Sequence, residues 1–278
     1  MATFITLTTD FGLRDGYVAA IKGVISSINP EAKIVDICHT IQPQNIREAA
    51  FVFSTAYIYF PPDTIHLVII DPGVGSNRRS VILKTSQAYF VGPDNGVFSY
   101  VIDASSPQPV PDSKRVKPGP EMQVYAITKS KYWREPVSKT FHGRDIFAPV
   151  AAKLSLGLNP SDLGEQVDNV IAFPIPHPEW TGNVIKGNIL HIDNFGNLIT
   201  NIRENNLSRF GGSVTVTVSD CKIEGLVHTY ADREGPIALF GSSGYLEISL
   251  PNDNIATFLK AMVEDQVIVE LQRNSKVI

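Results

Sequence analysis

The sequence predicts a mixed α/β protein in two parts: an N-terminal α/β domain with a mostly parallel central sheet, and a smaller C-terminal antiparallel β-barrel domain. Two observations support this fold class. Up to about residue 160, strand-like apolar runs are followed by segments with helical periodicity. Beyond about residue 180, short β-like runs are separated by turn residues. The length of 278 residues also exceeds that of a usual single core.

The N-terminal part opens with strand and helix patterns in turn. Residues 3–11 alternate apolar and polar side chains like a strand, and residues 15–28 place apolar side chains at helical spacing. Residues 32–38 and 66–71 are predicted strands, with a predicted helix at 45–60 between them. Strands that are separated by helices in this way are typical of a parallel sheet covered by helices.

After Asp71 the pattern changes. Residues 79–85 and 88–92 predict two strands joined by a short turn, which is an antiparallel addition to the sheet. Residues 93–96, with the sequence PDNG, predict a tight loop. Residues 105–120 are rich in Pro and Ser and predict a surface loop.

A proline-rich connector separates the two predicted domains. Residues 172–180 hold three prolines, which forbid a continuing helix and favour an extended chain. We therefore place the α/β domain at 1–172 and the β-barrel domain at 180–278. One late helix is predicted at 254–263, between the β-like runs of the second domain.

Composition narrows the function classes. Charged residues make up 19% of the chain and the formal net charge is −4, so we expect neither nucleic acid nor an anionic membrane as a partner. No apolar run approaches the ~20 residues of a membrane helix, and the start has no secretion signal. Two distant cysteines, Cys38 and Cys221, form no disulfide framework, so a cytoplasmic location is expected.

Four loops with an acid follow strand-like runs, in TTDFGLRDG, IIDPGVGS, FHGRDIF and HIDNFGN. Ligands of open α/β sheets bind outside the carboxyl ends of strands, so these carboxylates can converge on one crevice. For any single Asp before Gly, a turn or cap residue is the commoner interpretation. His142, just before a predicted helix, is a candidate acid or base near neutral pH, whereas Asp145 suits the helix start structurally.

The stretch HLVIIDPGVGSNRRS holds an apparent contradiction. Its glycines and Arg78 or Arg79 suit a phosphate, because backbone N–H groups in such turns bind anions. Asp71 would repel that phosphate. The chain also has none of the usual P-loop, hydrolase-elbow or Rossmann glycine motifs, and no histidine spacing typical of zinc. We therefore expect a ligand other than a nucleoside triphosphate, and a zinc site is not indicated.

The second domain holds two further candidate loops. In IDNFGNLITNI, an aromatic ring and amides suit an adenine-like ring, and the alternative is a simple Asx-type hairpin turn. In FGSSGYLEI, Ser242 and Ser243 lie between glycines and form either a plain hairpin or a nest for a carboxylate.

Taken together, these motifs resemble the S-adenosyl-L-methionine (SAM) hydrolase family, also called SAM hydroxide adenosyltransferases, which is homologous to the SAM-dependent fluorinase and chlorinase. The resemblance runs nearly end to end. It is carried by TTDFGLRDGYVAAIKG, IVDICHTIQPQNIREAA, IIDPGVGSNRRS, VGPDNGVFS, TFHGRDIFAP, IDNFGNLITNI and SSGYLEI. It implies a homotrimer with active sites between subunits. The implied reaction is attack of water or hydroxide on C5′ of SAM, which releases adenosine and L-methionine without a metal or cofactor.

The resemblance also implies roles for individual residues. Asp71, Arg78 and His142 match the family's water-handling Asp, Arg and His, and it stays open whether Asp71 or His142 takes the proton. The loop's glycines are expected to let C5′ approach, and Arg79 is left as a solvent or structural residue. The matching substrate-binding set is Asp10 for ribose, Phe195, Asn197 and Tyr230 for adenine, and Asp193, Ser242 and Asp15 for the methionine end.

Three positions depart from the halogenases. Asp71 stands where the fluorinase branch has a tyrosine, His142 replaces an aromatic residue, and Gly143 replaces a serine associated with fluoride. A carboxylate beside the nucleophile would repel a halide, so hydroxide is the predicted nucleophile. The alternatives that remain are a non-catalytic SAM or adenosine sensor, a halogenase-like enzyme, and generic hydrolysis by paired carboxylates.

Overall fold

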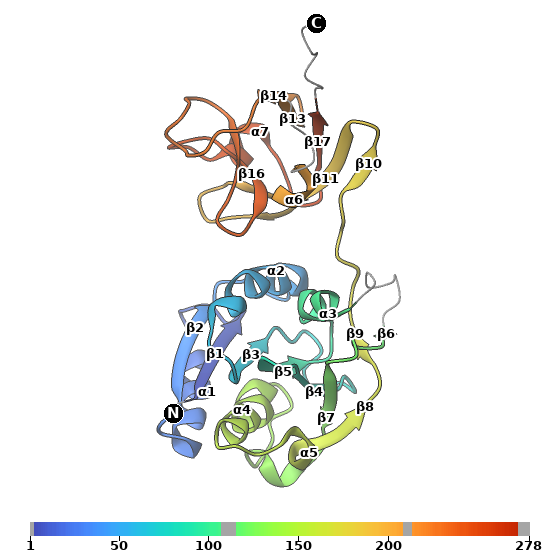
Figure 1. The fold of residues 1–278 in the computed structure, drawn as a ribbon. Coiled ribbons are helices and arrows are strands. Elements are labelled where there is room, and N and C mark those ends of the chain that lie inside the picture. The colour runs from blue at the N-terminus through green and yellow to red at the C-terminus, as the bar shows by residue number, and fades with distance from the viewer. Residues whose placement is uncertain (1–2, 107–114, 208–212, 272–278) are drawn as a thin grey trace, which may run out of the picture. The chain divides into compact units, whose positions relative to one another are not determined.

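The computed structural model describes residues 3–106, 115–207 and 213–271. The chain forms two compact units, Met1–Ile175 (unit 1) and Pro176–Ile278 (unit 2) (Figure 1). The division falls inside the proline-rich connector. Among the described residues, no helix has the length and apolar character needed to cross a bilayer.

Unit 1 is built on a seven-stranded sheet in the order β2-β1-β3-β5-β4-β7-β8. The first four of these strands run parallel to one another, and the remaining pairs are antiparallel. The predicted parallel sheet with an antiparallel addition is therefore confirmed. The strands are β1 (Phe4–Thr9), β2 (Lys33–Cys38), β3 (Thr64–Ile69), β4 (Ser80–Lys84), β5 (Ala88–Pro93), β7 (Gln123–Ile127) and β8 (Gly164–Val167).

Helices cover both faces of this sheet (Figure 1). The longer ones are α1 (Tyr17–Ile28), α2 (Ile46–Ala56), α3 (Ser99–Ser105) and α4 (Ala148–Ser155). Helices α1 and α4 pack on one face, and α2 and α3 pack on the other. The shorter ones are η1 (Tyr57–Tyr59), η2 (Ser130–Tyr132), the π-helix η3 (Gly143–Phe147) and α5 (Pro160–Leu163).

Alternate side chains along β3 and the residue that follows it pack into two different apolar clusters, one on each face of the sheet. Ile65, Leu67 and Ile69 join the cluster under α1 and α4, whereas Val68 and Ile70 join the cluster under α2 and α3. All six residues of β3 are buried, as expected for a central strand covered on both faces. The strand ends at Ile69, two residues before Asp71, so the carboxylate lies just beyond the carboxyl end of a parallel strand.

The predicted surface loop at 105–120 lies partly outside the described residues. Arg115–Val116 forms strand β6, which pairs with β9 (Val170–Ile171) in a separate two-stranded ribbon. The prediction of a loop was therefore wrong for these two residues, because a two-residue strand leaves no periodic signal in a sequence.

Unit 2 is an eight-stranded antiparallel sheet in the order β14-β13-β17-β11-β12-β16-β15, with β10 added beside β11. It curves around one apolar core, which confirms the predicted antiparallel barrel-like domain. The strands are β10 (Glu179–Thr181), β11 (Val184–Ile192), β12 (Leu198–Arg203), β13 (Val214–Val218), β14 (Cys221–Glu224), β15 (Ile237–Phe240), β16 (Tyr245–Ser249) and β17 (Gln266–Leu271).

Two short helices complete unit 2, α6 (Glu204–Leu207) and α7 (Ile255–Leu259). The predicted helix at 254–263 is therefore shorter than expected. Asn254 caps its start, and Lys260 ends it with a left-handed φ of 53°. Periodicity alone does not reveal that stop.

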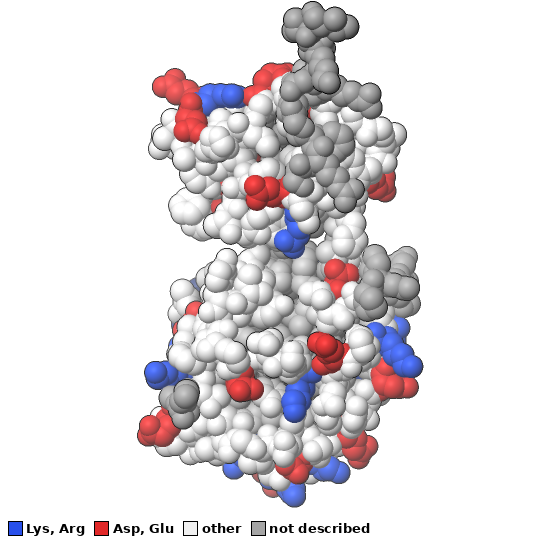
Figure 2. All heavy atoms as spheres, viewed as in Figure 1, with Lys and Arg blue, Asp and Glu red and all other residues white. Residues whose placement is uncertain are grey.

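Surface charge is mixed on the face drawn in Figure 2. Blue Lys and Arg side chains are interspersed there with red Asp and Glu side chains among residues of other kinds.

Candidate active site

Arg78 connects the two other predicted catalytic residues. Its Nε donates to Asp71 Oδ1 at 2.7 Å and its Nη2 donates to Asp71 Oδ2, which makes a two-pronged ion pair. The same Nη2 lies 2.9 Å from His142 Nδ1. The side chains of Asp71 and Arg78 are only 7% and 11% exposed. The structure thus brings His142 to Asp71 and Arg78, which lie in one loop more than 60 residues earlier in the sequence.

This contact decides the tautomer of His142. An arginine can only donate hydrogen bonds, so Nδ1 must accept, and the neutral ring carries its proton on Nε2. Burial lowers the pKa of His142 below its ordinary value, and the positive charge of Arg78 lowers it further, against the opposing effect of Asp71 and Asp145. Near neutral pH, His142 is therefore an uncharged ring with an Nε2–H donor.

The Asp71–Arg78 pair closes a glycine-containing turn at residues 72–77. Gly75 has a φ of +77°, and a Cβ there would lie 2.4 Å from the carbonyl oxygen of Lys139. Only glycine fits such a position without strain. Gly75 was expected to leave room for a substrate, but its surroundings show that it makes room for the segment leading to His142.

His142 is positioned by the start of the π-helix η3. The next acid, Asp145, is fully buried and accepts hydrogen bonds from Arg144 Nε at 2.7 Å and from Ser138 N at 2.9 Å. Burial favours its neutral form, but these bonds outweigh burial and hold the pKa of Asp145 below its ordinary value. Asp145 therefore fixes the turn beside His142, in the structural role that the sequence predicts.

A cavity of about 360 Å³ in unit 1 is lined by Asp71 and His142. Asp10 also lines it, and its Oδ2 accepts a hydrogen bond from Gln44 N at 2.8 Å. Asp15 is exposed ahead of α1 and lies outside the lining. The full lining is Asp10, Phe11, Tyr17, Pro43, Gln44, Ile69, Asp71, Pro72, Val74, Thr140, Phe141, His142 and Gly143.

Three aromatic rings form one wall of this cavity. The ring centroid of Phe141 lies 5.8 Å from that of Phe11 and 5.3 Å from that of Tyr17, both edge to face. The cavity therefore combines an apolar wall with two carboxylates and a neutral imidazole. That combination suits an organic ligand with hydroxyl groups and a positive charge.

A second cavity, of about 650 Å³, lies in unit 2 and is lined by Phe195, Asn197 and Tyr230. The side chains of Phe195 and Tyr230 are 75% and 48% exposed, although both are aromatic. Asn197 is buried. The structure thus brings the three predicted adenine-binding residues to one cavity, together with Asn254 of the α7 cap.

The other two predicted residues of unit 2 are placed differently. The carboxylate of Asp193 accepts from the backbone N–H of Phe195 at 2.9 Å and of Asn197 at 2.8 Å, in the Asx-type turn that was the structural alternative. It also accepts from Asn197 Nδ2 at 2.9 Å, so it holds a lining residue in place. Ser242 is exposed in the turn between β15 and β16, outside the lining of this cavity.

Comparison with protein-family models decides the family. The model for the SAM hydroxide adenosyltransferase N-terminal domain matches residues 5–164, and the model for the C-terminal domain matches residues 187–268. The chain belongs to the SAM hydroxide adenosyltransferase family. The resemblance identified from the sequence motifs is therefore confirmed.

Relatives in the SAM hydroxide adenosyltransferase family agree with this. The (R)-S-adenosyl-L-methionine hydrolase of Methanocaldococcus jannaschii is 35% identical over 95% of this chain and 94% of its own length. A fluorinase from an Actinoplanes species is only 26% identical, over 88% and 90%. An uncharacterized conserved protein of Thermotoga maritima has a similar structure, with a TM-score of 0.85 and 31% identity, over 95% and 99%.

Sequence reasoning missed one acid near the unit 2 cavity. Glu247, in β16, is only 6% exposed, and its Oε1 accepts from Tyr230 Oη at 2.7 Å and from Ser249 Oγ at 2.9 Å. Burial and this carboxylate raise the pKa of Tyr230, so its hydroxyl stays a donor to Glu247. The available signal was an acid inside the otherwise apolar run GYLEISL.

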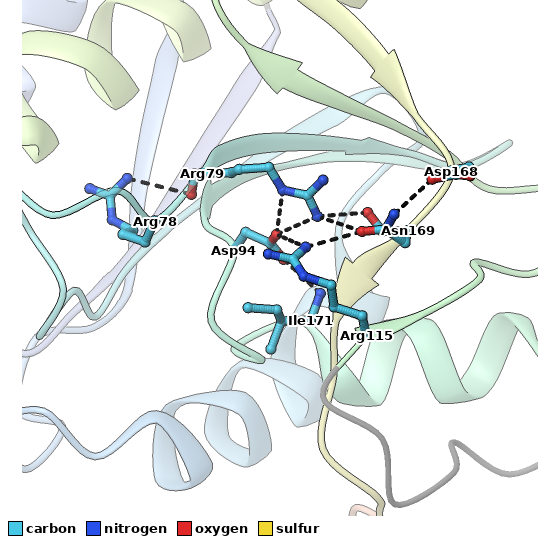
Figure 3. A network of polar contacts seen from close by, with 7 residues as sticks. All are labelled: Arg78, Arg79, Asp94, Arg115, Asp168, Asn169 and Ile171. Atoms are coloured by element: carbon cyan, nitrogen blue, oxygen red, sulfur yellow. Dashed lines mark hydrogen bonds and ion pairs between the residues drawn. The ribbon is translucent and has the colours of Figure 1, made fainter.

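Arg79, the second arginine of the loop, is a structural residue and not a solvent-facing one. Its side chain is 25% exposed and pairs with Asp94, whose side chain is fully buried. Figure 3 shows Arg78 and Arg79 pointing in opposite directions from neighbouring positions.

Proposed function

We propose that this protein hydrolyses S-adenosyl-L-methionine to adenosine and L-methionine by attack of water on C5′. The observation that carries the proposal is the hydrogen-bonded Asp71–Arg78–His142 assembly, of which Asp71 and His142 line a cavity that Asp10 also lines. Membership of the SAM hydroxide adenosyltransferase family, with hydrolases among its relatives, supports the substrate.

The chemistry requires little acid catalysis. In the reaction, the water oxygen forms a bond to C5′ while the C5′–S bond breaks, and its electron pair stays on the methionine sulfur. A sulfonium leaves as a neutral thioether and needs no proton. The enzyme must align a weak nucleophile and receive one proton. Alignment is the larger contribution, because effective molarities can supply about 7–11 kcal/mol, while a general base typically contributes about 10²–10⁴ in rate.

The tautomer of His142 supports Asp71 as the group that receives the proton. With Nδ1 of His142 occupied by Arg78, the ring offers the water a donor, Nε2–H, and no free lone pair. Asp71 offers carboxylate lone pairs that Arg78 leaves unoccupied, since each oxygen can accept more than one hydrogen bond. In this mechanism His142 orients the water and Asp71 accepts its proton.

The remaining residues are proposed to hold the substrate. Asp10 accepts hydrogen bonds from the two ribose hydroxyls, Phe195 and Tyr230 cover the adenine ring, and Asn197 binds its edge. Asp193 and Ser242, with Asp15 in a lesser role, serve the methionine end. We further propose a cytoplasmic homotrimer with sites between subunits, which uses no metal or other cofactor. The exposed aromatic rings of unit 2 support a site completed by a second surface.

The proposal is tested by incubating purified protein with SAM and separating the products by chromatography. Equal amounts of adenosine and methionine are expected, and incorporation of ¹⁸O from labelled water into adenosine O5′ would show attack at C5′. Tight SAM binding by calorimetry with no product between pH 6 and 9 would favour a sensor instead. Halide-dependent formation of a 5′-halogenated adenosine would favour a halogenase. Light scattering tests the trimer separately.

A further inference from the structure

The loop that follows β5 contacts the backbone on both sides of the candidate catalytic pair. Asn95 Nδ2 donates to the carbonyl oxygen of Ile70 at 2.8 Å, and Ile70 directly precedes Asp71. Asp94 N donates to the carbonyl oxygen of Arg79 at 3.0 Å, and Arg79 directly follows Arg78. Two adjacent residues thus hold the two ends of the turn that Asp71 and Arg78 close.

Asp94 is itself held from several directions (Figure 3). Its Oδ2 accepts from Arg79 Nε at 2.8 Å, and its Oδ1 accepts from Ile171 N at 2.7 Å. Arg115 Nη1 approaches Oδ2 at 3.4 Å. The side chain of Asp94 is fully buried, so its charge is compensated by these donors and not by water.

Arg79 extends the same network away from the cavity. Its Nη2 donates to the carbonyl oxygen of Asn169 at 2.8 Å and to its Oδ1 at 3.0 Å. The carbonyl oxygen of Arg79 also lies 3.5 Å from Arg78 Nη1. The backbone next to Arg78 is therefore fixed by β5, by β9 and by the residues that precede β9.

The turn at residues 72–77 is held partly by its own hydrogen bonds, from Val74 N to the carbonyl oxygen of Asp71 at 3.1 Å and from Ser76 N to that of Gly73 at 3.1 Å. Ser76 and Asn77 are exposed, and the contacts of Asp94 and Asn95 add anchors at both ends of the turn. The two-pronged ion pair requires the backbone at Asp71 and at Arg78 to be held in place, because both of its hydrogen bonds form only when carboxylate and guanidinium are correctly aligned. A displacement of about 1 Å can cost on the order of 10²-fold in rate.

We propose that Asp94 and Asn95 are positioning residues that hold Asp71 and Arg78 in the geometry required for attack on C5′. The inference rests on the proposed SAM hydrolysis. Both residues lie outside the lining of the unit 1 cavity and act through the backbone of Ile70 and Arg79. They are expected to affect the rate of the chemical step and not the binding of SAM.

The test compares Asn95→Ala and Asp94→Asn with a matched control. Asn183→Ala removes the same type of bond in unit 2, from Asn183 Nδ2 to the carbonyl oxygen of Leu271 at 2.9 Å. We expect kcat to fall by about 10- to 100-fold in both loop variants, with the KM for SAM within about 3-fold of wild type. Asn183→Ala should keep the wild-type kcat. Loop variants with a wild-type kcat, or with a loss confined to KM, would overturn the proposal.

Arg79 supplies a rescue comparison. Arg79→Lys keeps a cation beside Asp94 and should retain more of kcat than Arg79→Met, which leaves Asp94 buried without its main partner. Thermal unfolding is measured for every variant. If Asp94→Asn does not fold, Asn95→Ala and Arg79→Lys carry the test, because neither leaves a buried charge unpaired.

A readout independent of turnover separates this inference from the proposed function. The Nε–H of Arg78, which donates to Asp71, should exchange slowly with solvent in wild type and faster in Asn95→Ala, as measured by ¹⁵N NMR. No SAM hydrolysis by wild type would reject the proposed function. Unchanged exchange of the Arg78 Nε–H would reject the positioning role whether or not wild type turns over.

Discussion

The two cavities of this protein are built on opposite principles. In unit 1, Asp71 and Arg78 are almost fully buried and bonded to each other, with exposed fractions of 7% and 11%. In unit 2, Phe195 and Tyr230 present large apolar surfaces to solvent. A reacting charge needs a fixed position and little surrounding water, whereas a flat ring is recognised by faces that stay open until it binds. Changes at the Asp71–Arg78 pair should therefore alter rate, and changes at Phe195 and Tyr230 should alter affinity.

The largest effect is expected from Asp71→Asn. The amide is similar in size but cannot accept a proton, so kcat should fall by about 10²- to 10⁴-fold in steady-state assays with SAM. Glu165→Gln is the control, since Glu165 is 70% exposed and lies 3.8 Å from Lys129. If Asp71→Asn changed the KM for SAM but not kcat, the proposed difference between the two cavities would be wrong.

Acid should destabilise unit 1 through His66. This histidine is 1% exposed in β3, and burial lowers its pKa from 6.5 to about 3. The unfolded chain therefore binds a proton at His66 more readily than the folded chain does. The stability that neutral His66 contributes is complete above pH 6.5 and is lost as the pH falls toward 3. The total loss in the free energy of unfolding is about 5 kcal/mol.

The measurement uses the two tryptophans, one in each unit. Trp180→Phe leaves Trp133 as the fluorescent reporter of unit 1. As the pH is lowered from 7 to 4.5, the denaturant midpoint should fall steeply in Trp180→Phe. It should fall less steeply in the double variant that also carries His66→Gln. Equal slopes would show that His66 is not the responsible group.

Phe195→Ala should weaken adenosine binding by about 1–3 kcal/mol, the range for stacking of a base on an aromatic ring. Because Phe195 is 75% exposed, thermal unfolding should not change. Tyr59→Ala, at a ring that is 73% exposed in unit 1, is the matched control and should bind adenosine like wild type. Calorimetric titration with adenosine measures both. A large fall in melting temperature for Phe195→Ala would contradict a pure recognition role.

The smallest effect is expected at an exposed ion pair of unit 1. Lys22 Nζ lies 2.6 Å from Asp36 Oδ2, but the two side chains are 36% and 40% exposed. Lys22→Ala should cost about 0–1 kcal/mol in the free energy of unfolding, because water and salt screen such pairs. Chemical denaturation at low and high salt checks this. If Lys22→Ala lowered the free energy of unfolding as much as removal of a buried ion pair does, solvent exposure would not explain why the two cavities differ.

Much of the fold was predictable because it is written in local patterns. The nearly continuous apolar run of β3 reflects burial on both faces, and the helical spacing of α1 reflects burial on one face. Elements without such a signal were missed or misjudged, among them the ribbon strand at Arg115–Val116 and the early end of α7 at Lys260.

The sequence by itself determined the fold class, the family and the set of candidate residues, because periodic burial and several motifs in family order are readable along a chain. Only the tertiary structure decided how those residues are used. Arg78 and Arg79 are adjacent and chemically identical, yet one meets Asp71 and the other meets Asp94. The proton of His142 is assigned to Nε2 by an arginine that is distant in sequence. Partners of this kind are brought together by packing of separate strands and loops, and no local pattern encodes that.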